Sequence, residues 1–215
     1  MPRYTVPKDV SGRFPAKHAK GVDPELVGLR AFEHPAVLEW HRWVAEEYEP
    51  GSDVLLVTPC SNVKPYTRSP TSAKVRGVLR RLGLWDAATG RPRRLDWVYL
   101  SDLLALVPYE RAEEYPACCY ELHPDDLLSS PRHLATIASV VARALERLAE
   151  RLDAVVLFLP SKHLMVWEEA EKRASRKPRV VRVKYSIFSV KGLEETLAGL
   201  LGRDAPSTTL DRWMR

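Results

Sequence analysis

Residues 53–59 read DVLLVTP, an almost unbroken run of apolar side chains that ends in proline. A second run of the same kind, DAVVLFLP, occupies residues 153–160. Strands that are buried on both faces of a parallel sheet have this continuous apolar character, whereas strands with one wet face alternate between apolar and polar residues. The two runs therefore predict the centre of a parallel sheet that helices cover on both faces.

Two further runs have strand character, LDWVYLS at residues 95–101 and RVVRVKYSIF at residues 179–188. Helical periodicity appears between consecutive runs and again after the last one, and strands that alternate with helices imply right-handed crossovers. We therefore expect an α/β fold, a three-layer α/β/α sandwich with a four-stranded parallel sheet. The predicted helices of this core cover residues 73–85, 130–152, 161–175 and 192–202.

A chain of 215 residues with 45% hydrophobic composition suits one domain with appendages. Residues 1–22 predict an irregular N-terminal arm, residues 23–50 two helices that pack on the core, residues 51–203 the core domain, and residues 204–215 a C-terminal tail. No apolar run approaches the ~20 residues of a membrane helix, and the N-terminus lacks the apolar core of a signal peptide. We expect a cytoplasmic protein with no membrane partner.

Basic residues are concentrated in two segments. Nine lysines and arginines lie between residues 64 and 94 beside one acid, and seven lie between residues 172 and 184 without an acid. Such segments favour a nucleic-acid partner, because each phosphate contact releases counterions; a solvated face of an arginine-rich protein is the alternative. The candidate nucleic-acid-binding residues are Arg68, Lys74, Arg76, Arg80, Arg81, Arg176, Lys177 and Lys184.

The chain has three cysteines, Cys60 and the adjacent pair Cys118 and Cys119. They lack the spacing of zinc ligands, and there is no second cysteine cluster to complete a site. We therefore expect reduced thiols, no metal and no cofactor.

Ligands of open α/β sheets bind beyond the carboxyl ends of the strands, where PCSNVKPYTRS follows the first run at residues 59–69. Cys60 in this loop is a candidate nucleophile, and Lys64 would keep its thiol ionised or hold a phosphate. The alternative is that Cys60 is a small buried residue. The candidate substrate-binding residues of the loop are Pro59, Ser61, Pro65, Tyr66 and Ser69.

Several of these candidates have a structural alternative. Tyr66 would stack on an extruded base or pack against Pro65, and the hydroxyls of Ser61 and Ser69 would bind phosphate or cap the next helix. Asp102, after the second run, is a candidate general base or a helix cap. The candidate substrate-binding residues in the other loops are Ser101, Tyr109, Tyr115, Lys162, His163, Ser186 and Phe188.

The spacing in PCSNVKPYTRS resembles the signature of the archaeosine synthase family: proline-cysteine, three residues, lysine-proline-tyrosine, two residues, serine, two residues, histidine. Six positions match, and Ser72 stands where the family has histidine. HPAVLEWHRWVAEEYEPGSDVLLVTPCS before the motif and LVPYERAEEYPACCYEL after it are also similar to family segments. The resemblance covers about residues 33–190.

The resemblance implies a core similar to uracil-DNA glycosylases. It also implies a tRNA substrate whose deazaguanine base carries a nitrile group, to which lysine is added to form an amidine. The family joins this module to transglycosylase-like and PUA domains, so a partner subunit that carries them is expected. The alternatives are a silent nucleic-acid-binding module that has lost the histidine, and a glycosylase-like DNA protein. Uracil excision is not expected, because the water-activating motif of the glycosylases is missing.

Overall fold

The computed structural model describes residues 17–18, 21–186 and 188–202. Most of the predicted N-terminal arm and the whole predicted tail at residues 204–215 lie outside these residues. The central sheet has five strands in the order β7-β6-β2-β8-β9. Its strands are β2 (Val54–Pro59), β6 (Asp96–Ser101), β7 (Ala105–Pro108), β8 (Ala154–Leu157) and β9 (Val180–Arg182).

The four predicted strands are present and pair parallel with one another. The sheet is mixed, however, because β7 pairs antiparallel with β6, so the expectation of a four-stranded, purely parallel sheet is wrong. The hydroxyl of Ser101 closes the turn between these strands by accepting hydrogen bonds from the amides of Leu103 and Leu104, at 3.2 and 2.9 Å. This turn leaves Ala105 with a φ of 60° and reverses the chain within a segment that the sequence predicts as a loop.

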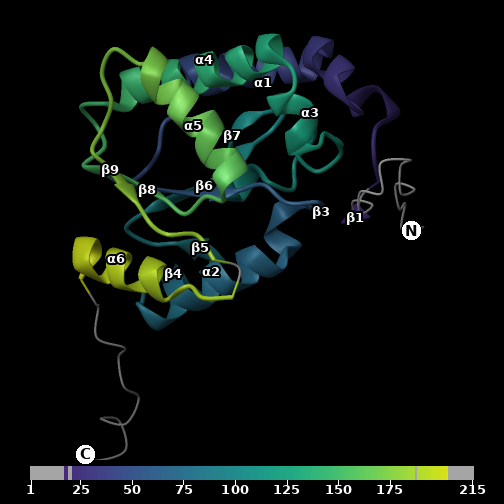
Figure 1. Cartoon of the computed structure of the whole chain (residues 1–215). Helices are drawn as coiled ribbons and strands as arrows, with labels where there is room; N and C mark the ends of the chain where they lie inside the picture. Colours follow the sequence, from purple (N-terminus) through teal and green to yellow (C-terminus); the bar gives the residue numbers. More distant parts are fainter. Residues whose placement is uncertain (1–16, 19–20, 187, 203–215) are drawn as a thin grey trace, which may run out of the picture.

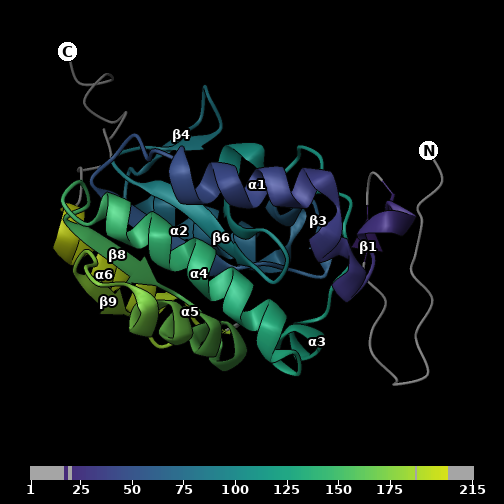
Figure 2. The same cartoon turned by 90° about the horizontal axis from the view of Figure 1, so that it is seen from above.

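Helices cover both faces of the sheet. Figure 1 shows α1, α4 and α5 on one face and α2 and α6 on the other, and Figure 2 shows α1, α4 and α5 side by side. These three layers agree with the predicted architecture. The helices are α1 (Pro35–Glu46), α2 (Pro70–Arg81), α3 (Pro124–Leu128), α4 (Pro131–Leu148), α5 (Ser161–Arg173) and α6 (Lys191–Leu201).

The N-terminal region differs from its prediction. In place of the first of the two helices there are two short 3-10 segments, Pro24–Leu26 and Leu29–Glu33, separated at Gly28, whose φ of 71° a right-handed helix does not allow. Two more 3-10 turns, at Tyr66–Arg68 and Tyr109–Arg111, follow strands. The remaining strands form two small pairs, β1 (Lys17–His18) with β3 (Val63–Lys64), and β4 (Trp85–Asp86) with β5 (Arg91–Pro92).

Apolar side chains fill the space between the layers. Every residue of β2 is buried, as expected for a strand between two neighbours and two helical layers. On the face that carries α4, the stripe of Ile137, Val141, Leu145 and Leu148 is buried. Among the described residues, no helix combines the length and the apolar character that crossing a membrane requires.

Trp97 on β6 is central to this packing, and we expect Trp97→Ala to lower the free energy of unfolding by about 3–5 kcal/mol. Its ring is 1% exposed and stacks on Tyr109 at 4.6 Å, and its indole nitrogen donates to Thr58 Oγ1 at 2.8 Å. Urea unfolding measures the loss. Trp43→Ala is the control, because Trp43 is only partly buried and should cost clearly less. Equal losses would contradict the central role of Trp97.

Candidate active site

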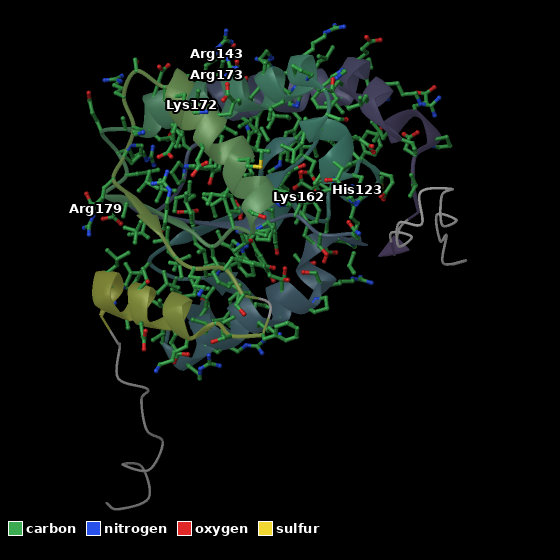
Figure 3. All side chains as sticks on the ribbon, viewed as in Figure 1. His123, Arg143, Lys162, Lys172, Arg173 and Arg179 are labelled. Carbon is green, nitrogen blue, oxygen red and sulfur yellow. The ribbon has the colours of Figure 1, made fainter. Side chains whose placement is uncertain are left out.

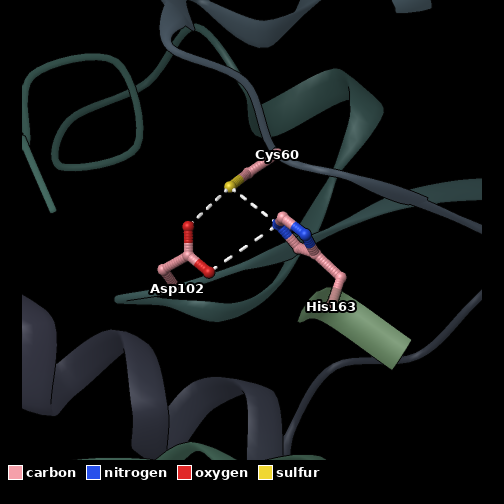
Figure 4. A group of neighbouring side chains, drawn as sticks. All are labelled: Cys60, Asp102 and His163. Carbon is pink, nitrogen blue, oxygen red and sulfur yellow. Dashed lines mark hydrogen bonds and ion pairs between the residues drawn. The ribbon is translucent and has the colours of Figure 1, made fainter. Parts of the chain in front are cut away.

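Three polar side chains meet beyond the carboxyl ends of two central strands. Cys60 follows β2, Asp102 follows β6, and His163 lies in the first turn of α5 (Figure 4). The amide of Cys60 donates to Leu100 O at 3.0 Å, which continues the ladder between β2 and β6 and fixes the position of the cysteine. Parallel strands and a crossover helix therefore bring together residues that lie 42 and 103 positions from Cys60.

The three side chains form one contact group, which we call the Cys60–Asp102–His163 cluster. The Cys60 thiol donates to Asp102 Oδ2 at 3.1 Å. His163 Nε2 lies 3.4 Å from Cys60 Sγ and 3.7 Å from Asp102 Oδ1. Asp102 is 3% exposed and His163 6%, whereas Cys60 keeps part of its surface accessible. A thiol, a carboxylate and an imidazole thus share one largely buried site.

The electrostatics of the cluster keep the thiol protonated at neutral pH. Burial raises the pKa of the Cys60 thiol well above its ordinary value, and the Asp102 carboxylate raises it further. Lys64 acts in the opposite direction but does not offset these effects. The prediction that Lys64 keeps the thiol ionised is therefore wrong, and a reaction at this sulfur needs a group that accepts its proton.

Lys64 is buried beneath the site. Only 3% of it is exposed, and its ammonium lies 4.3 Å from the centre of the Tyr120 ring and 4.0 Å from Glu121 Oε2. The aromatic face and the carboxylate compensate for the lost hydration of the charge. In this position Lys64 is not exposed to a phosphate on the surface, so the alternative role that the sequence suggests for it has no support in the structure.

A chain of buried hydroxyls lies beside Lys64. Tyr66 OH donates to Tyr120 OH, which lies 2.8 Å from Ser101 Oγ. Burial raises the pKa of both tyrosines well above the ordinary value, so both phenols are neutral. The Tyr66 ring has no exposed surface and packs on Tyr99 at 5.0 Å. The expectation that Tyr66 stacks on an extruded base is therefore wrong. The ring is buried, and its partners are the rings of Tyr99 and Tyr120, whereas the sequence alternative names Pro65.

Ser69 and Ser72 are structural residues of the α2 N-terminus. Ser69 Oγ accepts from the amide of Ser72 at 3.1 Å, so its capping alternative is confirmed. Ser72 Oγ donates to Tyr66 O at 2.7 Å and lies 2.9 Å from Tyr99 OH. Ser72 is 1% exposed and belongs to this packing, so a serine in place of histidine leaves the Cys60–Asp102–His163 cluster intact.

Other predicted residues have their own contacts. Ser61 Oγ accepts from the amide of Val63 at 3.0 Å, and Tyr115 OH donates to Asp23 at 2.8 Å. Tyr109 stacks on Trp97 at 4.6 Å, and Pro59 and Pro65 are buried.

Of the remaining candidate substrate-binding residues, Ser186 and Phe188 lie in the loop after β9, and Lys162 lies beside His163. Phe188 is 90% exposed, and Ser186 Oγ accepts from its amide at 3.2 Å. Lys162 Nζ pairs with Asp125 at 2.5 Å.

The second basic segment lies away from the cluster. Figure 3 shows Arg143, Lys172 and Arg173 together at one end of α4 and α5, whereas Lys162 and His123 lie at the other end of α5. At about 1.5 Å per helical residue, Arg173 is roughly 15 Å along α5 from His163.

Several of the predicted nucleic-acid-binding side chains also have protein partners. These are Arg81 with Glu194 at 2.6 Å, Arg176 with Glu150 at 2.6 Å, Lys177 with Glu171 at 3.5 Å, Arg76 with Thr67 O at 2.6 Å, and Arg80 5.7 Å from the Trp85 ring. Arg68, Lys74 and Lys184 are exposed. The basic segments are therefore partly neutralised on the surface of the fold.

The cluster also has the donor types of a transition-metal site. One sulfur, one oxygen and one nitrogen lie within 4.8 Å of one another, and zinc sites use such donors. Sequence spacing could not reveal this set, because each donor comes from a different segment. The expected absence of a metal and of a cofactor stays a prediction.

Two surface hollows lie elsewhere. One of about 600 Å³ is lined by residues at the amino ends of β2 and β8, and one of about 280 Å³ lies beside α1. Neither includes a residue of the Cys60–Asp102–His163 cluster.

A family described as a domain of unknown function, DUF5591, matches residues 37–197. The chain belongs to this family. The DUF5591 match contains all three residues of the cluster.

This DUF5591 protein is similar to one curated protein and one solved structure. It is 32% identical over 89 residues to archaeosine synthase subunit alpha of Thermoplasma acidophilum, which is 41% of this chain and 16% of that protein. The crystal structure of AF0587, a protein of unknown function, matches 75% of this chain and 49% of its own, with a TM-score of 0.50 and 20% identity. The second likeness concerns the fold alone.

Proposed function

We propose that this DUF5591 protein modifies a nitrile-bearing deazaguanine base in tRNA by joining lysine to the nitrile carbon, as an enzyme related to archaeosine synthase. The observation that carries the proposal is the Cys60–Asp102–His163 cluster, which places a thiol beside two polar partners at the ligand-binding edge of the sheet. The motif around Cys60 and the stretch of 32% identity to archaeosine synthase subunit alpha support the choice of substrate.

In the first step, Sγ of Cys60 bonds to the nitrile carbon and one π bond of the nitrile breaks. The thiol proton passes to Asp102, which already accepts its hydrogen bond, and from there to the nitrile nitrogen. The product is a thioimidate, in which the sulfur and the proton of the thiol have both been added to the nitrile, so no other reactant is consumed.

In the second step, the lysine amine bonds to the thioimidate carbon and the carbon–sulfur bond breaks. One amine proton passes through Asp102 to the leaving sulfur, which restores the thiol and leaves the amidine.

His163 orients the sulfur and stabilises the charge that develops on nitrogen. Its Nδ1 is buried and has no hydrogen-bond partner among the described residues, which favours a proton on Nε2. That N–H faces Cys60 and Asp102, where it can donate to the nitrogen of the substrate.

Recognition of the whole tRNA is assigned to a second subunit. Several basic side chains of this chain have acidic partners within the fold. A partner with transglycosylase-like or PUA domains would supply the missing contacts, while this chain supplies a uracil-DNA-glycosylase-like core with the reacting thiol.

Transfer of labelled lysine tests the proposal. The protein is mixed with labelled lysine and tRNA whose deazaguanine base carries the nitrile, and the label is expected in the RNA. The same tRNA with a carboxamide in place of the nitrile is the matched control and should stay unlabelled, because a thiol does not add to an amide in this way. The free nitrile base provides a second arm that needs no RNA-binding partner. Failure of both nitrile substrates would overturn the proposal.

A further inference from the structure

The adjacent cysteines Cys118 and Cys119 lie in contact on the loop that leads to the buried hydroxyl chain. Their sulfur atoms are 2.8 Å apart. A disulfide bond is about 2.0 Å long, so the two thiols need to approach by less than 1 Å to reach bonding distance. The sequence indicates only reduced thiols here, and the proposed lysine transfer does not use either of them.

We propose that Cys118 and Cys119 form a reversible vicinal disulfide when the protein meets a small-molecule disulfide, and that this bond disturbs the candidate active site through Tyr120. The two thiols differ in access, since Cys118 is 2% exposed and Cys119 is partly exposed. The oxidant therefore reaches Cys119 first, and the less exposed Cys118 lies beside its neighbour's sulfur.

The exchange balances without any other reactant. The Cys119 thiolate attacks the small disulfide and releases one small thiol, leaving a mixed disulfide. The Cys118 thiolate then attacks the Cys119 sulfur and releases the second small thiol. Two electrons and two protons leave the protein, and they appear in the two small thiols.

The resulting bond is easily reduced again. Residues 118 and 119 are joined by a trans peptide, which holds their α-carbons about 3.8 Å apart, below the ~4.4–6.8 Å of most disulfides. Strained disulfides have more oxidising potentials and are the labile ones. The pair therefore suits a switch better than a permanent cross-link.

The next residue connects the pair to the site. Tyr120 OH contacts Tyr66 OH and Ser101 Oγ, and its ring lies 4.3 Å from the ammonium of Lys64. Cys119 O accepts from the amide of Asp23 at 2.8 Å, and the amide of Glu121 donates to Leu26 O at 2.9 Å. A ring closed at residues 118 and 119 must turn the peptide between them, which strains these backbone bonds and moves Tyr120.

The test uses the full chain with Cys60→Ser, so that the vicinal pair holds the remaining thiols. After treatment with oxidised glutathione and removal of the reagent, we expect a loss of two hydrogens in mass, no reactive thiol, and recovery of both thiols with dithiothreitol. The matched control adds Cys118→Ser, which should leave a glutathione adduct on Cys119. An adduct or two reactive thiols in the Cys60→Ser protein would overturn the disulfide.

Coupling to the site has its own readouts. We expect the amides of Asp23 and Glu121 to exchange about tenfold faster on oxidation, because their hydrogen bonds to Cys119 O and Leu26 O weaken. In the protein that keeps Cys60, lysine transfer should fall about a hundredfold, as for a displacement of site residues by ~1 Å, and recover on reduction. The transfer readout rests on the proposed function, whereas mass and exchange do not. A disulfide that leaves exchange unchanged would overturn the coupling.

Discussion

Replacing Cys60 by alanine is expected to lower the rate of lysine transfer by at least about 10⁴-fold, the order of loss seen when a nucleophile is removed. The thiol of Cys60 is the group that bonds to the substrate, and neither partner in the cluster can replace it, because Asp102 and His163 act on protons and charge. The residue is small and partly exposed, so alanine leaves little empty space. Rates with saturating tRNA and lysine measure the effect.

Cys119→Ser is the matched control for this substitution. Cys119 is also partly exposed but lies outside the Cys60–Asp102–His163 cluster, so under reducing conditions the control should transfer lysine at the rate of the unchanged protein. A Cys60→Ala protein that keeps a tenth or more of that rate would rule out covalent catalysis by this thiol.

Asp102→Asn is expected to have opposite effects on two properties of the same sulfur. The Asp102 charge raises the pKa of the Cys60 thiol, so its removal lowers that pKa and increases the thiolate fraction below the original pKa. Alkylation of Cys60 by iodoacetamide at pH 8 should therefore become faster. Lysine transfer should become slower by about 10²–10⁴-fold, because the group that carries the proton has been lost.

Lys64→Met provides the electrostatic counterpart. Lys64 lowers the pKa of the Cys60 thiol, so its removal raises that pKa and makes alkylation slower at the same pH. Circular dichroism checks that the buried methionine is tolerated. If Asp102→Asn slows alkylation, or if it leaves lysine transfer unchanged, the carboxylate does not have the role assigned to it.

The strand pattern could be predicted because each parallel strand carries a continuous apolar run. The strand β7 could not, since it depends on a turn that the Ser101 hydroxyl closes with two amides. A turn that is closed by a side-chain hydroxyl leaves no periodic pattern in the sequence. The prediction of the first N-terminal helix is wrong for a related reason. A positive φ at Gly28 divides a segment whose apolar residues suggest helical spacing.

The candidate site was predicted one residue at a time. Cys60, Asp102 and His163 each follow a strand, and strand ends of an α/β sheet meet at one edge, so each could be named. Their mutual contacts could not, because the distances depend on how two strands and α5 are packed.

Several polar residues of the loop after β2 are buried, although the sequence predicts them to be exposed to a ligand. Lys64 and Tyr66 look like ligand-binding groups, because charged and hydroxyl side chains after a strand are usually exposed. Here they find partners within the protein, in the Tyr120 ring, the Glu121 carboxylate and the Ser101 hydroxyl chain. No local pattern reports such partners, which come from residues more than thirty positions away.

The most direct measurement is the mass of the Cys60 peptide after the protein meets nitrile-bearing tRNA, or the free nitrile base, in the absence of lysine. Without the amine the second step cannot occur, so the peptide should carry a thioimidate of the free base or, after nuclease digestion of the tRNA, of the nitrile-bearing nucleotide. Addition of lysine should then release the adduct as the amidine. A protein that transfers lysine but never carries the base on Cys60 would contradict the central claim.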